Sequence, residues 1–459
     1  MSREMKDSGV EWIGEIPENW GVTRLKYAYD NSNGSAVRVG PFGSALPSSD
    51  YISDGEWVYN QRTVLDENFT TNNTCVSKEK ADSLSGFRVY PGDILITTRG
   101  TLGHIAVVPN GAPSGILHPC IIRFRVDLSI VMPELLKYMF NDSDFFIKQI
   151  EFANNSTTIE ALYSYNLRDL ILPEIPITEQ SQIVHFLDRK CTVIDTVIEK
   201  TKKSLEKLEE YKKAVITKAV TKGIDPNAKM KDAHFLWLTA IPEKWGIYKL
   251  NHILDYNHPY PLGDGDHGSI KADSYVSSGI PFIRVQNLGY AEPINIENVV
   301  YITEAQNQKI QNSTLAPNDI LFAKTGATIG KTAIMPQTIS RANTTSHIGK
   351  ITVDTRYYVP KYIFYALSSE IGNHQLWSIA NKKATRPEVG LDEVKYIKLG
   401  IPLSVTEQKQ IADFLDEKLN QINNAISNHA NLIRKLEEYK KSLIYYAVTG
   451  KIDCRNEVI

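Results

Sequence analysis

The sequence has few cysteines and no long apolar run, and both absences narrow the class of protein. Only four cysteines occur in 459 residues, scattered without a CxxC pair, which argues against a zinc site and a disulfide framework. No apolar run reaches the roughly 18 residues that a membrane span needs. The opening MSREMKDSGVEW has no apolar h-region, so we expect no secretory signal and a cytoplasmic location.

An excess of one charge is also lacking. The formal net charge is −2, so the surface as a whole is not basic. Residues 21–175 carry 13 basic and 17 acidic side chains, and residues 246–400 carry 15 and 13. Binding to nucleic acid would therefore need a local basic face rather than a basic domain.

A duplication dominates what the sequence does contain. IPENWGVTRLKYAYD from Ile16 returns as IPEKWGIYKLNHILD from Ile241, and TEQSQIVHFLD from Thr178 returns as TEQKQIADFLD from Thr406. LEEYKK and AVTxxID recur as well, and the offset drifts only from 225 to 228 along the chain. So many ordered matches predict two tandem copies of one unit, with closely matched ends and diverged middles.

The closely matched ends are predicted to be long helices. Thr178 and Thr406 are expected as N-caps, and Gly223 and Gly450 as helix ends. A 4,3 spacing of apolar residues predicts a coiled-coil seam, interrupted at Thr201/His429 and Lys212/Lys440. Its apolar members are Leu187, Ile194, Ile198, Leu205, Leu208, Leu415, Ile422, Ile426, Ile433 and Leu436. We expect the two helices to pair antiparallel; the alternative, that each packs only on its own domain, stays open.

The middles are predicted to be mixed α/β. Short β-rich runs bounded by Gly, Pro and Asn indicate strands, and Pro133 and Pro360 fit the first turns of helices. The expected fold class is α+β: two tandem mixed α/β domains separated by two long helices in an antiparallel coiled coil, with pseudo-twofold symmetry. The expected segments are 1–20 (N-terminal conserved segment), 21–175 (first domain), 176–224 (central helix), 225–245 (linker and repeat start), 246–400 (second domain) and 401–459 (distal helix).

Three enzyme-like patterns are weak. TGATIGKT from Thr325 nearly matches a phosphate-binding P-loop, but the pattern needs Gly where Thr325 stands. GDGDHG from Gly263 fits GxGxxG by letter, yet its acids would repel a pyrophosphate. Asp266 and His267 are conceivable metal ligands without further ligands at helical spacing. We therefore expect no metal, no bound cofactor and no catalytic residue in this chain.

The opening SGVEWIGEIPENW, the two TEQxQIxxFLD starts, the two LEEYKK helices and the two AVTxxID ends resemble the specificity (S) subunit of type I restriction-modification systems, over essentially the whole chain. The resemblance implies that 21–175 and 246–400 are target-recognition domains, each reading one half of a bipartite double-stranded DNA target. It implies that the paired helices set the spacing and dock two modification subunits, which are adenine-specific DNA methyltransferases. Two restriction-translocase subunits would complete an ATP-dependent endonuclease, and S-adenosylmethionine, ATP and Mg would belong to those partners.

Candidate DNA contacts are basic, amide or Gly-rich-loop residues, because Arg and Lys suit guanine edges and phosphates while Asn and Gln suit adenine edges. GPFGS at 40–44 and the DGxH sequence at 264–267 resemble loops of the family's recognition domains. The candidates in the first domain are Arg38, Phe42, Ser44, Asn60, Gln61, Arg62, Arg99, Thr101, Asn154 and Asn155. Those in the second domain are Asp266, His267, Lys271, Arg284, Gln286, Asn287, Lys324, Thr325, Lys331, Asn381, Lys382, Lys383 and Arg386.

Two other functions compete with DNA reading. A protein-interaction scaffold without DNA recognition would share the duplication and the helices, and the weak domain charge favours it slightly. An NTP-using enzyme rests only on the near-P-loop. On the helices, Lys212/Lys440 and Tyr211/Tyr439 are expected to face either the modification subunits or solvent.

Overall fold

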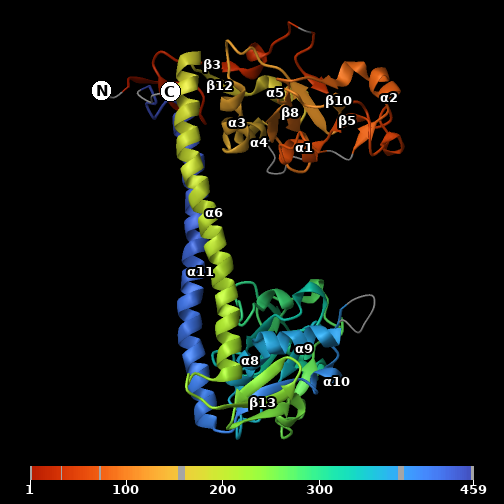
Figure 1. Ribbon diagram of the computed structural model, residues 1–459, viewed down its shortest axis with the longest axis vertical. Helices are drawn as coiled ribbons and strands as arrows, with labels where there is room; N and C mark the ends of the chain where they lie inside the picture. Colours follow the sequence, from red (N-terminus) through yellow and green to blue (C-terminus); the bar gives the residue numbers. More distant parts are fainter. Residues whose placement is uncertain (1–2, 33, 72–73, 154–160, 381–386, 456–459) are drawn as a thin grey trace. The chain divides into compact units, whose positions relative to one another are not determined.

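The computed structural model describes residues 3–32, 34–71, 74–153, 161–380 and 387–455. The chain folds into two compact units (Figure 1). Unit 1 comprises Met1–Lys202 with Asn431–Ile459, and unit 2 comprises Lys203–Ala430. Because the division passes through both long helices, each unit contains a part of each helix.

Unit 1 is built on two four-stranded sheets, ordered β6-β5-β10-β7 and β4-β11-β8-β9, with the short pairs β1-β2 and β12-β3 beside them. Its strands are β1 (Met5–Asp7), β2 (Glu15–Pro17), β3 (Gly21–Arg24), β4 (Arg38–Val39), β5 (Glu56–Tyr59), β6 (Cys75–Val76), β7 (Arg88–Val89), β8 (Ile94–Thr97), β9 (Ile105–Val107), β10 (Gly115–Leu117), β11 (Ile121–Phe124) and β12 (Ile171–Glu174). Its short helices are α1 (Gln61–Leu65), α2 (Lys78–Ser83), α3 (Pro133–Asn141), α4 (Phe145–Ala153) and α5 (Ser164–Asp169).

Unit 2 has a three-stranded sheet, β18-β17-β21, a four-stranded sheet, β16-β22-β19-β20, and the pairs β13-β14 and β15-β23. Its strands are β13 (Met230–Phe235), β14 (Leu238–Pro242), β15 (Trp245–Lys249), β16 (Leu262–Asp264), β17 (Ile280–Ile283), β18 (Val300–Ile302), β19 (Ile320–Ala323), β20 (Thr332–Ile334), β21 (Asn343–Thr344), β22 (Ile348–Ile351) and β23 (Lys398–Pro402). Its short helices are α7 (Glu304–Lys309), α8 (Pro360–Ser368), α9 (Glu370–Ala380) and α10 (Leu391–Val394).

The two units repeat one topology. β10 runs parallel to β5 and β21 runs parallel to β17, whereas the neighbouring pairs in both units are antiparallel. In the other sheet, β8 lies antiparallel to both β9 and β11, as β19 does to β20 and β22. The diverged middles therefore share a fold, and the expected α+β class with two repeated domains and two long helices is confirmed.

The predicted strands and helices of the middles are also found. The runs around Trp57, Ile94, Ile105, Ile121, Ile280 and Ile320 form β5, β8, β9, β11, β17 and β19. Proline is the first residue of both α3 and α8, where its missing N–H costs no hydrogen bond. Residues 225–245, expected as linker and repeat start, contain the β13-β14 hairpin, whose strands pair Met230 with Pro242.

The long helices are α6 (Ile177–Lys222) and α11 (Val405–Val448). Both begin one residue before the expected caps, so the assignment of Thr178 and Thr406 as N-caps is wrong. Pro176 O and Ser404 O accept the first helical hydrogen bonds, and Ser404 Oγ also accepts one from Glu407 N at 3.4 Å. The two Thr residues therefore lie inside the first turn.

The predicted helix ends are confirmed. Gly223 follows α6 with φ +72°, and Gly450 follows the last turn of α11 with φ +70°, the left-handed conformation that glycine adopts at a helix C-terminus. Each glycine packs against a repeat start. A Cβ at residue 450 would lie 2.4 Å from Pro17 Cγ, and one at residue 223 would lie 3.5 Å from the ring of Trp245.

Within each unit the two helix parts pack on each other with opposite directions. In unit 1, Asp195 and Lys202 of α6 pair with Lys440 and Glu437 of α11. Every predicted seam residue is buried or half-buried. The fully or largely buried members are Leu187, Ile194, Ile198, Leu415 and Ile422; the half-buried members are Leu205, Leu208, Ile426, Ile433 and Leu436.

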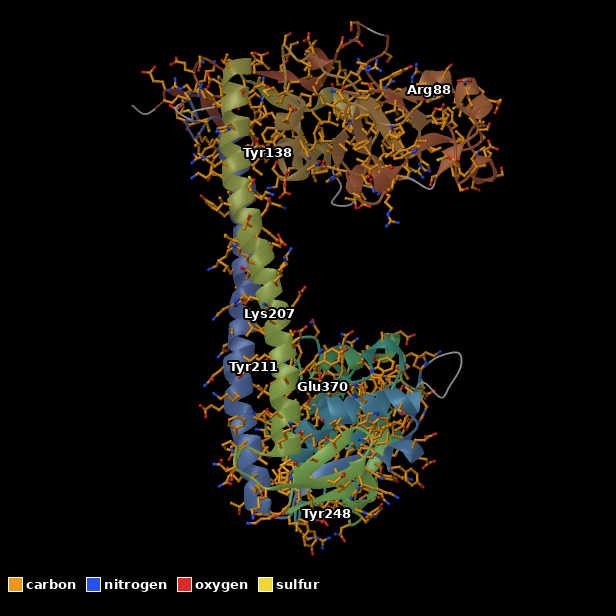
Figure 2. All side chains as sticks on the ribbon, viewed as in Figure 1. Arg88, Tyr138, Lys207, Tyr211, Tyr248 and Glu370 are labelled. Atoms are coloured by element: carbon orange, nitrogen blue, oxygen red, sulfur yellow. The ribbon has the colours of Figure 1, made fainter. Side chains whose placement is uncertain are left out.

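The polar interruptions of the seam have partners inside the chain. Lys212 Nζ lies 2.7 Å from Glu292 Oε1, and the lysine is only 2% exposed. Lys440 Nζ lies 2.8 Å from Asp142 Oδ1 and 2.9 Å from Asp195 Oδ2. Burial opposes the charge of Lys440, but the hydrogen bonds that it donates to the two carboxylates outweigh burial and raise its pKa. Both lysines thus attach a long helix to the domain beside it, while Tyr211 (Figure 2) and Tyr439 are exposed.

Tyrosines on the short helices make a second attachment at equivalent positions. Tyr138 of α3 donates to Asp188 of α6 at 2.6 Å in unit 1 (Figure 2). Tyr365 of α8 donates to Asp416 of α11 at 2.6 Å in unit 2. Burial, followed by the carboxylate that accepts each hydrogen bond, raises the pKa of both phenols, so both remain donors.

Candidate DNA interface

In unit 1 the carboxyl ends of β4, β5, β8 and β10 meet at one edge of the two sheets. His118 N donates to Tyr59 O at 3.1 Å, Thr98 Oγ1 donates to Cys120 O at 2.9 Å, and Gly40 N donates to Ile121 O at 2.9 Å. Four loops therefore lie side by side although they are distant in sequence. We call this surface edge 1 and define it as residues 40–44, 60–62, 98–101 and 118–120.

The GPFGS loop of edge 1 depends on its first glycine. A Cβ at residue 40 would lie 2.1 Å from His118 O, so only glycine allows this approach. The loop then turns outward, leaving Phe42 88% exposed and Ser44 exposed. An apolar side chain held this far into solvent has no role in the core of unit 1.

The next predicted contacts divide into structural and exposed side chains. Asn60 caps α1, because its Oδ1 accepts from Thr63 N at 3.1 Å. Gln61 is half-buried beside the 98–101 turn, where its Nε2 lies 3.2 Å from the place a Cβ at residue 100 would take. Arg62 is exposed, 3.3 Å from Asp66, an ion pair too solvated to hold it firmly.

The 98–101 turn is fixed from within and presents an arginine. Thr97 Oγ1 donates to Thr101 O at 2.6 Å and accepts from His104 N at 3.0 Å. Arg99 and Thr101 are exposed. Arg38 lies further back on β4, exposed, with its guanidinium carbon 5.7 Å from the ring centroid of Phe87. Asn154 and Asn155 lie outside the described residues.

Unit 2 has an equivalent edge at the carboxyl ends of β16, β17, β19 and β21. We call it edge 2 and define it as residues 265–269, 284–287, 324–327 and 345–347. A Cβ at residue 265 would lie 2.0 Å from Thr344 O, so Gly265 repeats the role of Gly40. Counting on from these two glycines, His267 stands where Phe42 stands in unit 1. His267 has φ +48° and its side chain is 68% exposed, with Nε2 3.2 Å from Asp264 Oδ1.

Several candidates of edge 2 are buried and occupied. Asp266, 7% exposed, accepts from Ile270 N at 2.9 Å and from Ser346 N at 3.2 Å. Lys324, 5% exposed, pairs with Asp264. Asn287, 1% exposed, accepts from the backbone N–H of Arg284 at 2.9 Å. These three side chains stabilise loops of unit 2 through contacts within the unit. The sequence alone did not distinguish such residues from residues exposed for base contact.

The remaining candidates of unit 2 are more accessible. Lys271 and Gln286 are exposed, and Lys331 is half-buried. Thr325 Oγ1 lies 3.1 Å from His347 Nδ1. Arg284 is half-buried, donating to Asn298 O at 2.9 Å beside the ring of Tyr275. Asn381, Lys382, Lys383 and Arg386 lie outside the described residues.

The enzyme-like patterns lack the expected surroundings. The segment that resembles a P-loop joins β19 to β20 through a single 3-10 turn, Gly326–Thr328, so no α-helix follows it to receive a phosphate. In the described part of the chain no group of three or more His, Cys, Asp and Glu is placed to hold a metal ion. None of the helices described there is long and apolar enough to cross a membrane.

Sequence reasoning missed the buried carboxylates that hold the sheets together at the ends of β8 and β19 opposite the two edges. Asp93, fully buried, accepts from Tyr90 N at 2.8 Å and binds Arg125 and, at 3.7 Å, Arg123. Asp319, 1% exposed, repeats this in unit 2. It accepts from Ala316 N at 2.8 Å and from Thr352 Oγ1 at 2.6 Å, with Lys350 at 3.8 Å. The repeated PGD and PND before a strand were the available signal.

A pair of glutamines was missed in the same way. Gln180 accepts from Met132 N at 2.8 Å and donates to Ile130 O at 2.7 Å. Gln408 accepts from Val359 N at 2.8 Å and donates to Tyr357 O at 3.1 Å. The Gln of each TEQ motif therefore joins a long helix to the loop before α3 or α8.

Comparisons with known proteins agree with this arrangement. The family model described as "Type I restriction modification DNA specificity domain" matches residues 43–210 and 242–432. The chain is 23% identical to the type I restriction enzyme EcoBI specificity subunit of Escherichia coli, covering 95% of this chain and 88% of that one. It is 24% identical to the MjaVIII specificity subunit of Methanocaldococcus jannaschii, covering 96% and 95%.

A solved structure supports the fold independently. It comes from work on complex assembly and conformational transition of the type I R-M system, and it matches with a TM-score of 0.68 at 16% identity, over 95% of this chain and 99% of that one. At this identity the likeness concerns the fold alone. Since the family model covers most of the chain in two tandem matches, the chain belongs to the family of type I restriction-modification DNA specificity subunits.

Proposed function

We propose that edge 1 and edge 2 each read one half of a bipartite double-stranded DNA target. The supporting observation is that the two edges have equivalent backbones but different exposed side chains. Gly40 and Gly265 each bring a loop against the neighbouring strand in the same way, yet one loop exposes Phe42 and the other His267 at its tip. A shared scaffold with different exposed side chains suits two different half-sites. Pseudo-symmetric domains meet half-sites about one helical turn apart.

Burial sharpens the proposed contact set. In edge 1 and beside it, exposure favours Arg38, Phe42, Ser44, Arg62, Arg99 and Thr101. In unit 2 it favours His267, Lys271 and Gln286. The secondary candidates are half-buried: Gln61, Arg284, Thr325 and Lys331. Neither domain is strongly basic, so we expect weak DNA affinity of the isolated chain and a salt dependence set by the whole complex.

The long helices are proposed to set the spacing and to dock the modification subunits. Forty-odd helical residues span about 65 Å, enough for a ruler. On the part of α11 in unit 1, Leu432, Tyr439 and Tyr446 are exposed at intervals of seven residues, and so share one face of the helix. Such an exposed apolar row suits a protein partner.

Catalysis is proposed to belong to the partners. Two modification subunits would supply adenine methylation with S-adenosylmethionine. Two restriction-translocase subunits would supply cleavage with ATP and Mg. This chain would confer target specificity on the assembly without a catalytic group of its own, in the cytoplasm where the DNA lies.

Modified-base sequencing tests the proposal directly. A host without DNA methylation would express this chain with the modification subunit encoded beside it. We expect methyl-adenine in a motif of two halves separated by a fixed gap. Absence of any motif, together with a stable complex on a sizing column, would contradict DNA reading and favour the scaffold.

Two altered chains divide the proposal into its parts. Replacing residues 21–175 with another recognition domain is expected to change one half of the motif and leave the other. Inserting four residues into α6 alone is expected to change the gap while both halves persist. A change in both halves after the replacement, or an unchanged gap after the insertion, would refute modular reading or the ruler role, respectively.

A further inference from the structure

Two exposed tyrosines follow edge 1 in sequence and have no role in the core. Tyr163 and Tyr165 are 55% and 59% exposed. Their ring centroids are 5.5 Å apart and their planes differ by only 7°. The pair therefore presents a stacked aromatic surface to solvent at the start of α5.

The backbone places this pair beside the 98–101 turn. Leu162 N donates to Thr98 O at 2.9 Å, directly before Arg99. Tyr163 N donates to Asn166 Oδ1 at 3.0 Å, and Asn166 N donates back to Tyr163 O at 3.0 Å. These bonds fix the backbone that carries the two rings before any ligand arrives, which lowers the entropy lost on binding.

The second repeat has the same backbone connection without the rings. Val389 N donates to Lys324 O at 2.8 Å, as Leu162 N does to Thr98 O. The residues after Val389 include Gly390 and Asp392, where unit 1 has tyrosines. The frame therefore does not need aromatic side chains here, and the tyrosines are a property of unit 1 alone.

We infer that Tyr163 and Tyr165 contact bases of the DNA half-site that unit 1 reads, through the apolar surfaces of their rings. This inference rests on the proposed function. Exposed rings beside an exposed arginine are a combination that suits nucleic acid: aromatic side chains pack on thymine methyl groups or against base steps, while arginine binds base edges or phosphates. Phe42 extends the same apolar character across edge 1.

The test compares three variants in the complex with the modification subunits. Tyr163→Ala with Tyr165→Ala removes both rings, and Tyr163→Phe with Tyr165→Phe keeps them. Tyr27→Ala removes a tyrosine that is 67% exposed on the 3-10 helix Leu25–Ala28, where it lines a hollow with Ile130 and Gln180. Fluorescence anisotropy measures binding to the wild-type target and to duplexes with either half replaced, and modified-base sequencing records the motif.

We expect the double Ala variant to bind the target about tenfold more weakly, since a base–aromatic contact has this scale. It should also lose discrimination in the first half only. The double Phe variant and Tyr27→Ala should bind like the wild type. Because all three positions are exposed, the melting temperatures should agree, and a sizing column reports assembly.

Three outcomes overturn the inference. Unchanged affinity and motif in the double Ala variant would show that the rings touch no base. An equal loss on every duplex would indicate backbone contact without base reading. Loss of assembly with the modification subunits would make the pair a protein-docking surface. Failure of the proposed function is distinguishable, because the wild-type complex would then yield no bipartite motif at all.

Discussion

The two recognition regions share a frame and differ at its tips. Gln180 and Gln408 make the same hydrogen bonds between a long helix and the loop that precedes α3 in unit 1 or α8 in unit 2. At the tips, by contrast, unit 1 has the exposed phenyl ring of Phe42 where unit 2 has the imidazole of His267 at the equivalent position. Residues that hold backbone in place are repeated, and residues that only meet solvent are free to diverge.

The same contrast explains why little sequence similarity survives in the middles. A shared backbone of this kind needs a few buried polar side chains at fixed positions. The partners of these side chains can differ between the repeats, provided that they still satisfy the buried group. Asp93 faces two arginines, whereas Asp319 faces Lys350 and a threonine hydroxyl. The carboxylate is retained in both repeats, while its partners differ.

The largest effect is expected from removing these carboxylates. Asp93→Ala would leave Arg123 and Arg125 uncompensated, at a cost of about 3–5 kcal/mol, because arginine stays protonated. Asp319→Ala should cost less, since a lysine sheds its proton more easily and burial already lowers the pKa of Lys350. Urea unfolding of both variants against wild type measures the difference.

The pH dependence separates the two cases. In Asp319→Ala the buried Lys350 would have a lower pKa folded than unfolded, so its penalty should shrink as pH rises towards the unfolded value of about 10.4. Asp93→Ala should show no such recovery. Equal losses of unfolding free energy with equal pH profiles would contradict this difference between Asp93 and Asp319.

A smaller effect is expected at the helix ends. Gly223→Ala should cost about 1 kcal/mol for the left-handed backbone. Gly450→Ala should cost at least about 2 kcal/mol, because its Cβ would also collide with Pro17. Gly9→Ala, with φ +72° and no atom within 4 Å of the added Cβ, measures strain alone. Melting temperatures that fall equally in all three variants would exclude the collision.

Substitutions of the exposed loop residues Phe42 and His267 should weaken DNA binding without changing the free energy of unfolding. Phe42→Ala and His267→Ala are each expected to weaken target binding about fivefold to tenfold, the scale of one lost base contact. Each loss should disappear on duplexes whose corresponding half is already replaced. Anisotropy on half-substituted duplexes measures this, and Leu236→Ala, an 83% exposed side chain in the β13-β14 turn, is the control. Equal effects on both halves would contradict separate readers.

The smallest effect concerns pH at edge 1. Burial lowers the pKa of His118, and its Nδ1 accepts from Cys120 N at 3.1 Å, so the folded state favours the neutral ring. The stability from this ring is complete above the unfolded pKa of about 6.5 and is lost as pH falls through the folded value. The loss should stay below about 1 kcal/mol after solvent screening.

His118→Asn keeps an acceptor for Cys120 N and removes the titration. Melting temperatures at pH 7.5 and 5.5 should therefore fall less in this variant than in the wild type. If both fall equally, His118 does not contribute to the acid sensitivity of unit 1.

Much of the fold followed from local pattern. The repeated motifs predicted the duplication, the seam predicted two long helices, and Pro133 and Pro360 marked helix starts that the structure contains. These features depend on neighbours along the chain. The N-caps predicted at Thr178 and Thr406 were misplaced by two residues, because Pro176 and Ser404 supply the carbonyls that accept the first helical hydrogen bonds.

The site was predicted less well, since the sequence marked polar loop residues without saying which of them face solvent. Arg99 and Phe42 are exposed, as a contact residue needs to be. Asn287 and Lys324 are polar residues in similar loops, yet they are buried on partners within unit 2. No local rule distinguishes these two fates.

By itself, then, the sequence determined the duplication, the α+β class, the helical seam and the family. Only the tertiary structure decided which polar side chains are buried and bonded within the fold and which are exposed to a ligand. Asp266 illustrates the reason: one of its partners, Ser346 N, lies 80 residues away. A buried carboxylate is stable only when such distant donors reach it, and that meeting depends on how the strands pair.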